Sequence, residues 1–136
     1  MADAQLVLLV VTRKPIPPGQ LVLYKVLYDA GDGWVGQKEL AQQTHSGSVA
    51  ALNGVLRALA NRVDQTSAEF KREKHGFALM IEKIAHEGEW YYRITPELRQ
   101  VIDSTPHLKD TMALSIADIH AKHSKMKDWL IVDAGG

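Results

Sequence analysis

The chain of 136 residues contains no cysteine. Disulfide bonds, thiolate zinc sites and cysteine nucleophiles are therefore excluded. The chain also has no excess of charge, because 16 Lys and Arg residues balance 16 Asp and Glu residues. Nucleic-acid-binding proteins often carry a basic excess that drives binding through counterion release. The balance argues against strong non-specific binding and leaves room only for a local basic face.

Long hydrophobic runs are missing as well. The apolar run Leu6–Val11 is about a third of the length that a membrane-spanning helix needs. No basic segment precedes this run, so we predict neither a signal peptide nor membrane attachment, and we expect a cytoplasmic protein. With 46% hydrophobic and 24% charged residues, the composition is typical of one globular domain with attached end segments.

Catalytic motifs are also absent. The sequence has no phosphate-binding glycine loop, no Gly-x-Ser-x-Gly elbow and no His-Glu-x-x-His motif. His120 and His123 are three residues apart, which on a helix can bring both near one metal ion, but no further ligand is evident. We therefore predict that the protein is not an enzyme and has no catalytic residues, cofactor or metal.

The first 19 residues are predicted to be an N-terminal strand and a proline-rich linker. Leu6–Val11 is short and rich in β-branched residues, which favours a buried strand. Three prolines between positions 15 and 18 then exclude regular structure.

Residues 20–104 are predicted to form the main domain. Apolar spacing indicates a helix from Gln20 that the glycines at 31 and 33 stop, a short extended piece at Trp34 and Val35, and a second helix over 37–43. A third helix is predicted over 47–63, with Ser46 or Ser48 as its N-cap. Its buried stripe would be Val49, Leu52, Leu56, Leu59 and Val63.

A β-hairpin is predicted to follow a polar loop over 67–76. Phe77, Leu79 and Ile81 alternate along one strand, and a second alternating strand follows the turn 86–89. Its apolar positions are Trp90, Tyr92 and Ile94. Thr95 and Pro96 are predicted to open a short helix that ends near Ser104.

This order of elements resembles the winged helix-turn-helix superfamily over residues 20–95. The matching segments are the scaffold helix at Gln37–Thr44, the recognition helix at Gly47–Val63 and the wing strands at Phe77–Ile84 and Glu89–Ile94. The resemblance implies an α+β fold with a two-stranded wing and a DNA-binding function. The family also includes pure protein-interaction modules, so the fold alone does not settle the function. Glu87 and Glu89 in the hairpin turn argue against contact between this wing and phosphate.

The face of helix 47–63 opposite the buried stripe carries residues suited to reading bases. Asn53, Arg57 and Asn61 are the predicted base contacts, because Asn pairs with adenine and Arg with guanine in the major groove. The alternative is that these side chains only solvate an exposed face. Predicted phosphate contacts are Ser46 and Ser48 near the helix N-terminus and Lys71, Arg72 and Lys74 in the loop, which could equally be a solvated charge run.

Residues 105–136 are predicted to hold a C-terminal helix. An apolar seam with spacings of three and four would pack on another helix, either across a homodimer or within the chain. Its members are Met112, Ile116, Ile119, His123, Met126 and Leu130.

We expect a small homodimeric transcription regulator that binds double-stranded DNA through helix 47–63. The alternative is a protein-interaction module or inhibitor that uses the same fold to bind a polypeptide. The neutral net charge and the acidic hairpin turn favour this alternative.

Overall fold

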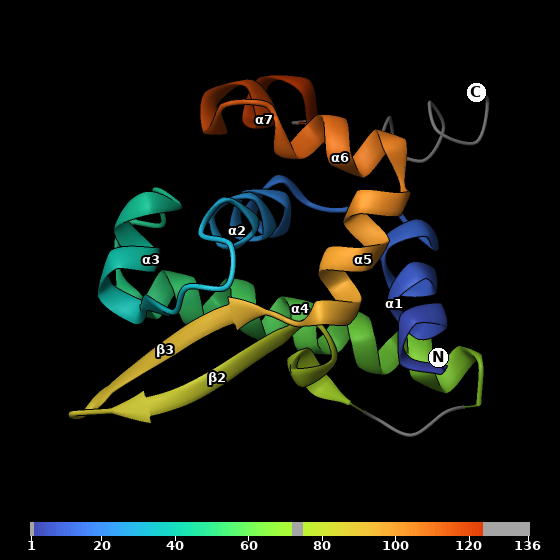
Figure 1. Cartoon of the computed structure of the whole chain (residues 1–136), viewed down its shortest axis with the longest axis horizontal. Coiled ribbons are helices and arrows are strands. Elements are labelled where there is room, and N and C mark those ends of the chain that lie inside the picture. The colour runs from blue at the N-terminus through green and yellow to red at the C-terminus, as the bar shows by residue number, and fades with distance from the viewer. Residues whose placement is uncertain (1, 72–74, 124–136) are drawn as a thin grey trace.

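The computed structural model describes residues 2–71 and 75–123. In these ranges the chain forms seven α-helices, one 3-10 helix and a small antiparallel sheet of three strands, which confirms the predicted α+β class (Figure 1). The elements are α1 (Ala2–Thr12), α2 (Pro18–Asp29), β1 (Val35–Gly36), α3 (Gln37–Gln43), α4 (Val49–Glu69), the 3-10 helix η1 (Gly76–Leu79), β2 (Ile81–His86), β3 (Glu89–Ile94), α5 (Pro96–Ser104), α6 (Pro106–Met112) and α7 (Ile116–His123).

Helix α2 is the centre of the hydrophobic core. It lies between α4 on one side and α6 with α7 on the other (Figure 1). Its residues Leu21, Leu23, Tyr24 and Leu27 are completely buried. Because α2 is covered from several sides, its apolar residues extend around the helix instead of forming one stripe.

The sheet has the order β1-β3-β2, with both pairs antiparallel. The two-residue turn at Glu87 and Gly88 has φ values of 50° and 79°, the positive values that a type I′ hairpin turn requires. The predicted hairpin is therefore confirmed, but the strand predicted from Phe77 is wrong at its start. Residues 76–79 form η1 instead, and Asp64 of α4 accepts backbone hydrogen bonds from His75 and Gly76 that hold this segment against α4.

The predicted N-terminal strand is wrong, because Leu6–Val11 lies inside helix α1. Leu6, Val7, Val10 and Val11 are buried against the rest of the core, whereas Leu8 is 44% exposed. This arrangement is a helical stripe, in which positions i, i+1, i+4 and i+5 share one face. A run of six apolar residues fits either structure from the sequence alone, and the packing of α1 against α4 and α5 decides for the helix.

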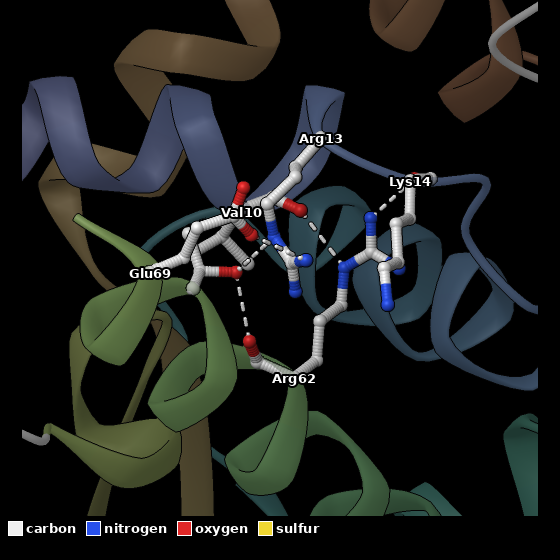
Figure 2. Close-up of polar contacts among 6 residues, drawn as sticks. Val10, Arg13, Lys14, Arg62 and Glu69 are labelled. Atoms are coloured by element: carbon white, nitrogen blue, oxygen red, sulfur yellow. Dashed lines mark hydrogen bonds and ion pairs between the residues drawn. The ribbon is translucent and has the colours of Figure 1, made fainter.

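Helix α4 is longer than predicted, since it continues past Val63 to Glu69. The buried side of this extension is polar, with Thr66 and Ser67 covered by other residues, and Arg62 just before it is buried as well. The Arg62 guanidinium lies at the C-terminal end of α1 and donates hydrogen bonds to the backbone carbonyl oxygens of Val10, at 2.8 Å, and Lys14 (Figure 2). It also donates to the Pro15 carbonyl oxygen at 2.9 Å. Burial lowers the pKa of Arg62 from its ordinary value. These contacts connect α1 and the following linker to α4.

The predicted C-terminal seam does not lie on one helix. Met112 is the last residue of α6 and Ile116 the first of α7. Met112 and Ile119 are buried in the protein's own core, and Ile116 packs against it, so these three residues pack within the chain. The His123 side chain, Met126 and Leu130 lie outside the described part. None of the described helices is long and apolar enough to span a membrane.

Candidate nucleic-acid interface

Helices α3 and α4 are joined by a tight turn over residues 44–48. The turn needs left-handed backbone at His45, with φ of 57°, and at Gly47, with φ of 89°. The Thr44 hydroxyl donates to the Leu40 carbonyl oxygen at 2.7 Å and lies 2.7 Å from the Ser46 hydroxyl oxygen. These contacts fix the direction in which α4 leaves α3.

Ser48 is the N-cap of α4. Its side-chain oxygen accepts a hydrogen bond from the backbone N–H of Ala51 at 3.0 Å, which confirms one of the two predicted caps. Ser46 instead belongs to the end of α3, where its backbone N–H donates to the Ala41 carbonyl oxygen. Both serine hydroxyls are therefore held in place near the first turn of α4, although their oxygens already take part in hydrogen bonds within the protein.

The outward face of α4 is the most regular exposed surface near this turn. Asn53, Arg57 and Asn61 follow each other at intervals of four residues, and all three are exposed as predicted. None of the three has a hydrogen-bond or ion-pair partner within the described residues. Gly54 lies on the same face, and a Cβ atom added there would meet no atom within 4 Å. The face is therefore open, with three polar side chains available to an outside partner.

The charge on this face is simple. No Asp or Glu occurs between Val49 and Val63, and the two arginines of this stretch have different surroundings. Arg62 is buried at the end of α1, so Arg57 is the charge that the N-terminal two-thirds of α4 presents to solvent. The face is polar and weakly positive, in a chain whose net charge is zero.

A shallow depression of about 400 Å³ lies beside the N-terminus of α4. Lys38 and Gln42 of α3 border it together with His45, Gly47 and Ser48 of the turn. We did not predict a role for Lys38, Gln42 or His45 from the sequence. The three are spaced four and three apart, a spacing that places them on one side of a helix and its C-terminal turn, and this signal could have identified them.

Of the predicted phosphate contacts in the loop, Lys71 lies far from Ser48. Ser48 caps the start of α4 and Lys71 follows its end, so the 21 residues of α4 separate them. At a rise of 1.5 Å per residue this is about 31 Å along the helix, so the two cannot contact the same phosphate. Lys71 is exposed, with φ of 55°. Arg72 and Lys74 lie outside the described residues.

The β2–β3 hairpin lies at the same end of the molecule as α3 and the start of α4 (Figure 1). The Glu89 carboxylate is turned inward, where it accepts a hydrogen bond from the backbone N–H of Lys38 at 3.2 Å and so caps α3. Glu87 extends from the tip and is largely exposed. On one face of the hairpin, the Lys83 ammonium lies 4.3 Å from the centre of the Trp90 ring. Of the two turn carboxylates, Glu87 alone opposes an approaching phosphate.

The opposite face of the sheet is apolar and partly exposed. Trp34, Ile84, His86 and Tyr91 line a groove of about 220 Å³. Arg93 lies beside this groove, where its guanidinium stacks on Trp34 at 4.2 Å and pairs with Glu82 at 2.8 Å. Arg93 therefore covers the flank of its own sheet.

Comparison with known proteins gives no relative to guide the assignment. No protein-family model, no curated protein and no solved structure matches the chain. Among the described residues, no group of three or more His, Asp or Glu side chains is placed to hold a metal ion.

Proposed function

We propose that this protein is a winged helix-turn-helix DNA-binding protein, with α3 and α4 as the helix pair and β2–β3 as the wing. The order α2, β1, α3, α4, β2, β3 and the pairing of β1 with β3 support this proposal. In such an arrangement the second helix of the pair enters the major groove, and the first lies across the backbone. A transcription regulator is the function that this mode of binding serves most directly.

The observation that carries the proposal is the open face of α4. Asn61 lies eight positions after Asn53, or about 12 Å along the helix at 1.5 Å per residue, which corresponds to about three to four base pairs. Arg57 would bind guanine O6 and N7, and each asparagine would bind adenine N6 and N7. Gly54 between them would allow the helix axis to approach the base edges closely, since no side chain intervenes.

The phosphate contacts follow from the depression at the start of α4. Lys38 and His45 would contact one DNA strand there, together with the Ser46 and Ser48 hydroxyls. The Ser48 hydroxyl accepts from the Ala51 N–H and so can still donate to a phosphate oxygen, whereas the Ser46 hydroxyl donates to the Thr44 oxygen and would have to exchange that bond for one to phosphate. Lys71 would contact a different stretch of the DNA backbone, because the length of α4 separates it from Ser48, and Arg72 and Lys74 remain proposed phosphate contacts outside the described residues.

The test is binding of a fluorescent randomised duplex pool, followed by anisotropy at 50 and 200 mM salt. We expect binding that weakens steeply with salt, because each neutralised phosphate contributes about −0.9 to the slope of log K against log salt. The double variant Asn53→Ala/Arg57→Ala should lose sequence preference, at about 1–3 kcal/mol for a lost bidentate contact. Gln65→Ala is the matched control, because Gln65 is also exposed on α4 but lies beyond the proposed reading face.

Two results would contradict the proposal: the absence of binding at 50 mM salt, or equal effects of the double variant and Gln65→Ala. The first would favour the second candidate function, binding of a polypeptide. One observation supports that candidate independently of charge. On one face of the hairpin Ile84 is 44% exposed beside the apolar groove that it forms with Trp34, His86 and Tyr91, and exposed apolar patches mark protein–protein contact sites.

A further inference from the structure

The outer edge of β2 is open. β2 is at one end of the strand order β1-β3-β2, and no described element pairs with its outer side. In Figure 1 the hairpin extends beyond the helices, with β2 as its rim. An unpaired strand edge presents backbone N–H and C=O groups that can pair with another chain.

The register shows which residues present these groups. His86 and Glu89 flank the two-residue turn, and residue pairs of an antiparallel ladder alternate between hydrogen-bonded and non-hydrogen-bonded. The even-numbered residues of β2 therefore bond to β3, as does Met80, whose carbonyl oxygen accepts from the Thr95 N–H at 3.0 Å. Ile81, Lys83 and Ala85 direct their N–H and C=O groups outward.

Proteins commonly block such an edge with a lysine, a proline or a bulge. β2 contains no proline, and its six residues pair with β3 in unbroken register. Its one lysine is Lys83, and the ammonium lies over the Trp90 and Phe77 rings, at 4.3 Å and 5.3 Å from their centres. Lys83 therefore covers one face of the hairpin, and the other face presents the exposed Ile84.

We propose that β2 pairs antiparallel with β2 of a second copy of this chain, with the two-fold axis at Ile84. This register places each outward-directed Lys83 opposite Ala85 of the second copy, and each pair exchanges both of its N–H···O bonds. The two Ile84 side chains meet at the axis, beside the apolar grooves formed by Trp34, Ile84, His86 and Tyr91 of each copy. The two sheets become one continuous sheet.

Side-chain complementarity selects this register over its neighbours. An axis at Lys83 would place two ammonium groups opposite each other, and like charges in that position are destabilising. An axis at Ala85 would require strand pairing by Glu87, whose φ of 50° belongs to the turn. The axis at Ile84 instead places Glu82 opposite His86 of the second copy. Arg93 binds Oε1 of Glu82, so Oε2 is available to accept from an imidazole N–H.

This pairing does not rest on the proposed DNA-binding function, because it involves β2 and leaves α4 uncovered. It also differs from the C-terminal seam, whose residues Met112 and Ile119 are buried within one chain. Two copies joined at β2 would present two α4 helices related by a two-fold axis, whatever α4 binds.

Single cysteines test the contact, since the chain has none of its own. Opposite residues of a non-hydrogen-bonded pair have Cα atoms about 4.5 Å apart, within the range that a disulfide spans. Mild oxidation should therefore convert Ile84→Cys into a dimer that reductant separates. Ala85→Cys is the control. In the proposed register the Cα atoms of residue 85 in the two copies lie about 8 Å apart by the strand spacings, which is too far for a disulfide.

Sedimentation of the unmodified chain and two charge variants completes the test. The unmodified chain should associate as its concentration rises. Ile84→Glu should weaken association by about tenfold or more, because two carboxylates meet at the axis. Ala85→Glu adds the same charge one residue away, but opposite Lys83, and should associate at least as tightly as the unmodified chain. Both positions are exposed, and circular dichroism confirms that each variant is folded.

Four results would overturn the pairing. These are a monomer at every concentration, failure of Ile84→Cys to crosslink, crosslinking of Ala85→Cys as fast as Ile84→Cys, and equal weakening by the two glutamate variants. The last three would assign any dimer to another surface.

Discussion

Replacing Arg62 with methionine tests how α1 is held on the rest of the protein. Arg62 is 9% exposed, and its guanidinium donates to three backbone carbonyl oxygens at the end of α1 and in the linker after it (Figure 2). Methionine keeps the unbranched apolar stem and removes every donor. Because the last carbonyls of a helix have no partner within the helix, the Val10 oxygen depends on Arg62.

The magnitude follows from the surroundings of the three oxygens. Val10 is fully buried, so its carbonyl bears the full cost of an unsatisfied acceptor, about 1–3 kcal/mol. Lys14 is exposed and Pro15 half-buried, so water can replace part of those two bonds. The loss is offset in part because the variant no longer buries a cation, the same burial that lowers the pKa of Arg62. We expect a net loss of about 2–4 kcal/mol in the free energy of unfolding.

Urea denaturation measures this loss as a fall of about 1–2 M in the midpoint at an unchanged slope. Arg13→Met is the matched control. Arg13 bonds to the Thr66 hydroxyl at 2.9 Å and to Glu69 at 3.0 Å, but the Glu69 side chain is 55% exposed and the Thr66 hydroxyl keeps its bond to the Arg62 carbonyl oxygen. That variant should lose less than about 1 kcal/mol. Equal midpoints for the two variants would refute the assignment of Arg62 as the main connection between α1 and α4.

Two further predictions concern α4 and α2. Gly54→Ala should raise the free energy of unfolding by about 0.5–1 kcal/mol, because Gly54 lies inside an exposed helix and a Cβ meets no neighbour; a lower melting temperature would contradict this. Burial raises the pKa of Tyr24 well above its ordinary value, so the stability that Tyr24 supplies is fully present below about pH 10 and is lost as pH rises above it, by up to about 1.4 kcal/mol per unit. Tyr24→Phe should unfold with a weaker dependence on pH above 10, and identical pH profiles for the two proteins would contradict this.

The sequence was most informative where one face of an element is buried and the other exposed. The apolar stripe of α4 indicated which side of the helix faces the core and which faces solvent, so the exposure of Asn53, Arg57 and Asn61 could be predicted. The hairpin could also be predicted from the sequence, because the alternation along β3 and the turn around Gly88 fit no other local structure as well. Thr95 and Pro96 correctly predicted the start of α5, where the Thr95 hydroxyl accepts from the Leu98 N–H.

Parts of the site could not be predicted because they depend on residues far apart in the chain. The sequence predicted that Glu89 would oppose phosphate contact, yet its carboxylate caps α3 by accepting from the Lys38 N–H. Lys38 and Glu89 are 51 positions apart in the chain. Ser48 and Lys71 are both predicted phosphate contacts, but α4 continues to Glu69 and so places them at its two ends. The open edge of β2 depends on the order of three strands, which the local pattern does not encode.

Periodicity by itself therefore determined the α+β class, the exposed face of α4 and the hairpin, because alternation and helical stripes record which side of an element meets water. Tertiary structure alone decided that Leu6–Val11 is helical, that α4 continues to Glu69 and that the C-terminal seam is divided between α6 and α7. The physical reason is the same in each case. A short apolar run or a buried polar residue fits several local structures, and the choice is made by the distant groups that satisfy its hydrogen bonds and cover its surface, as Arg62 does for α1.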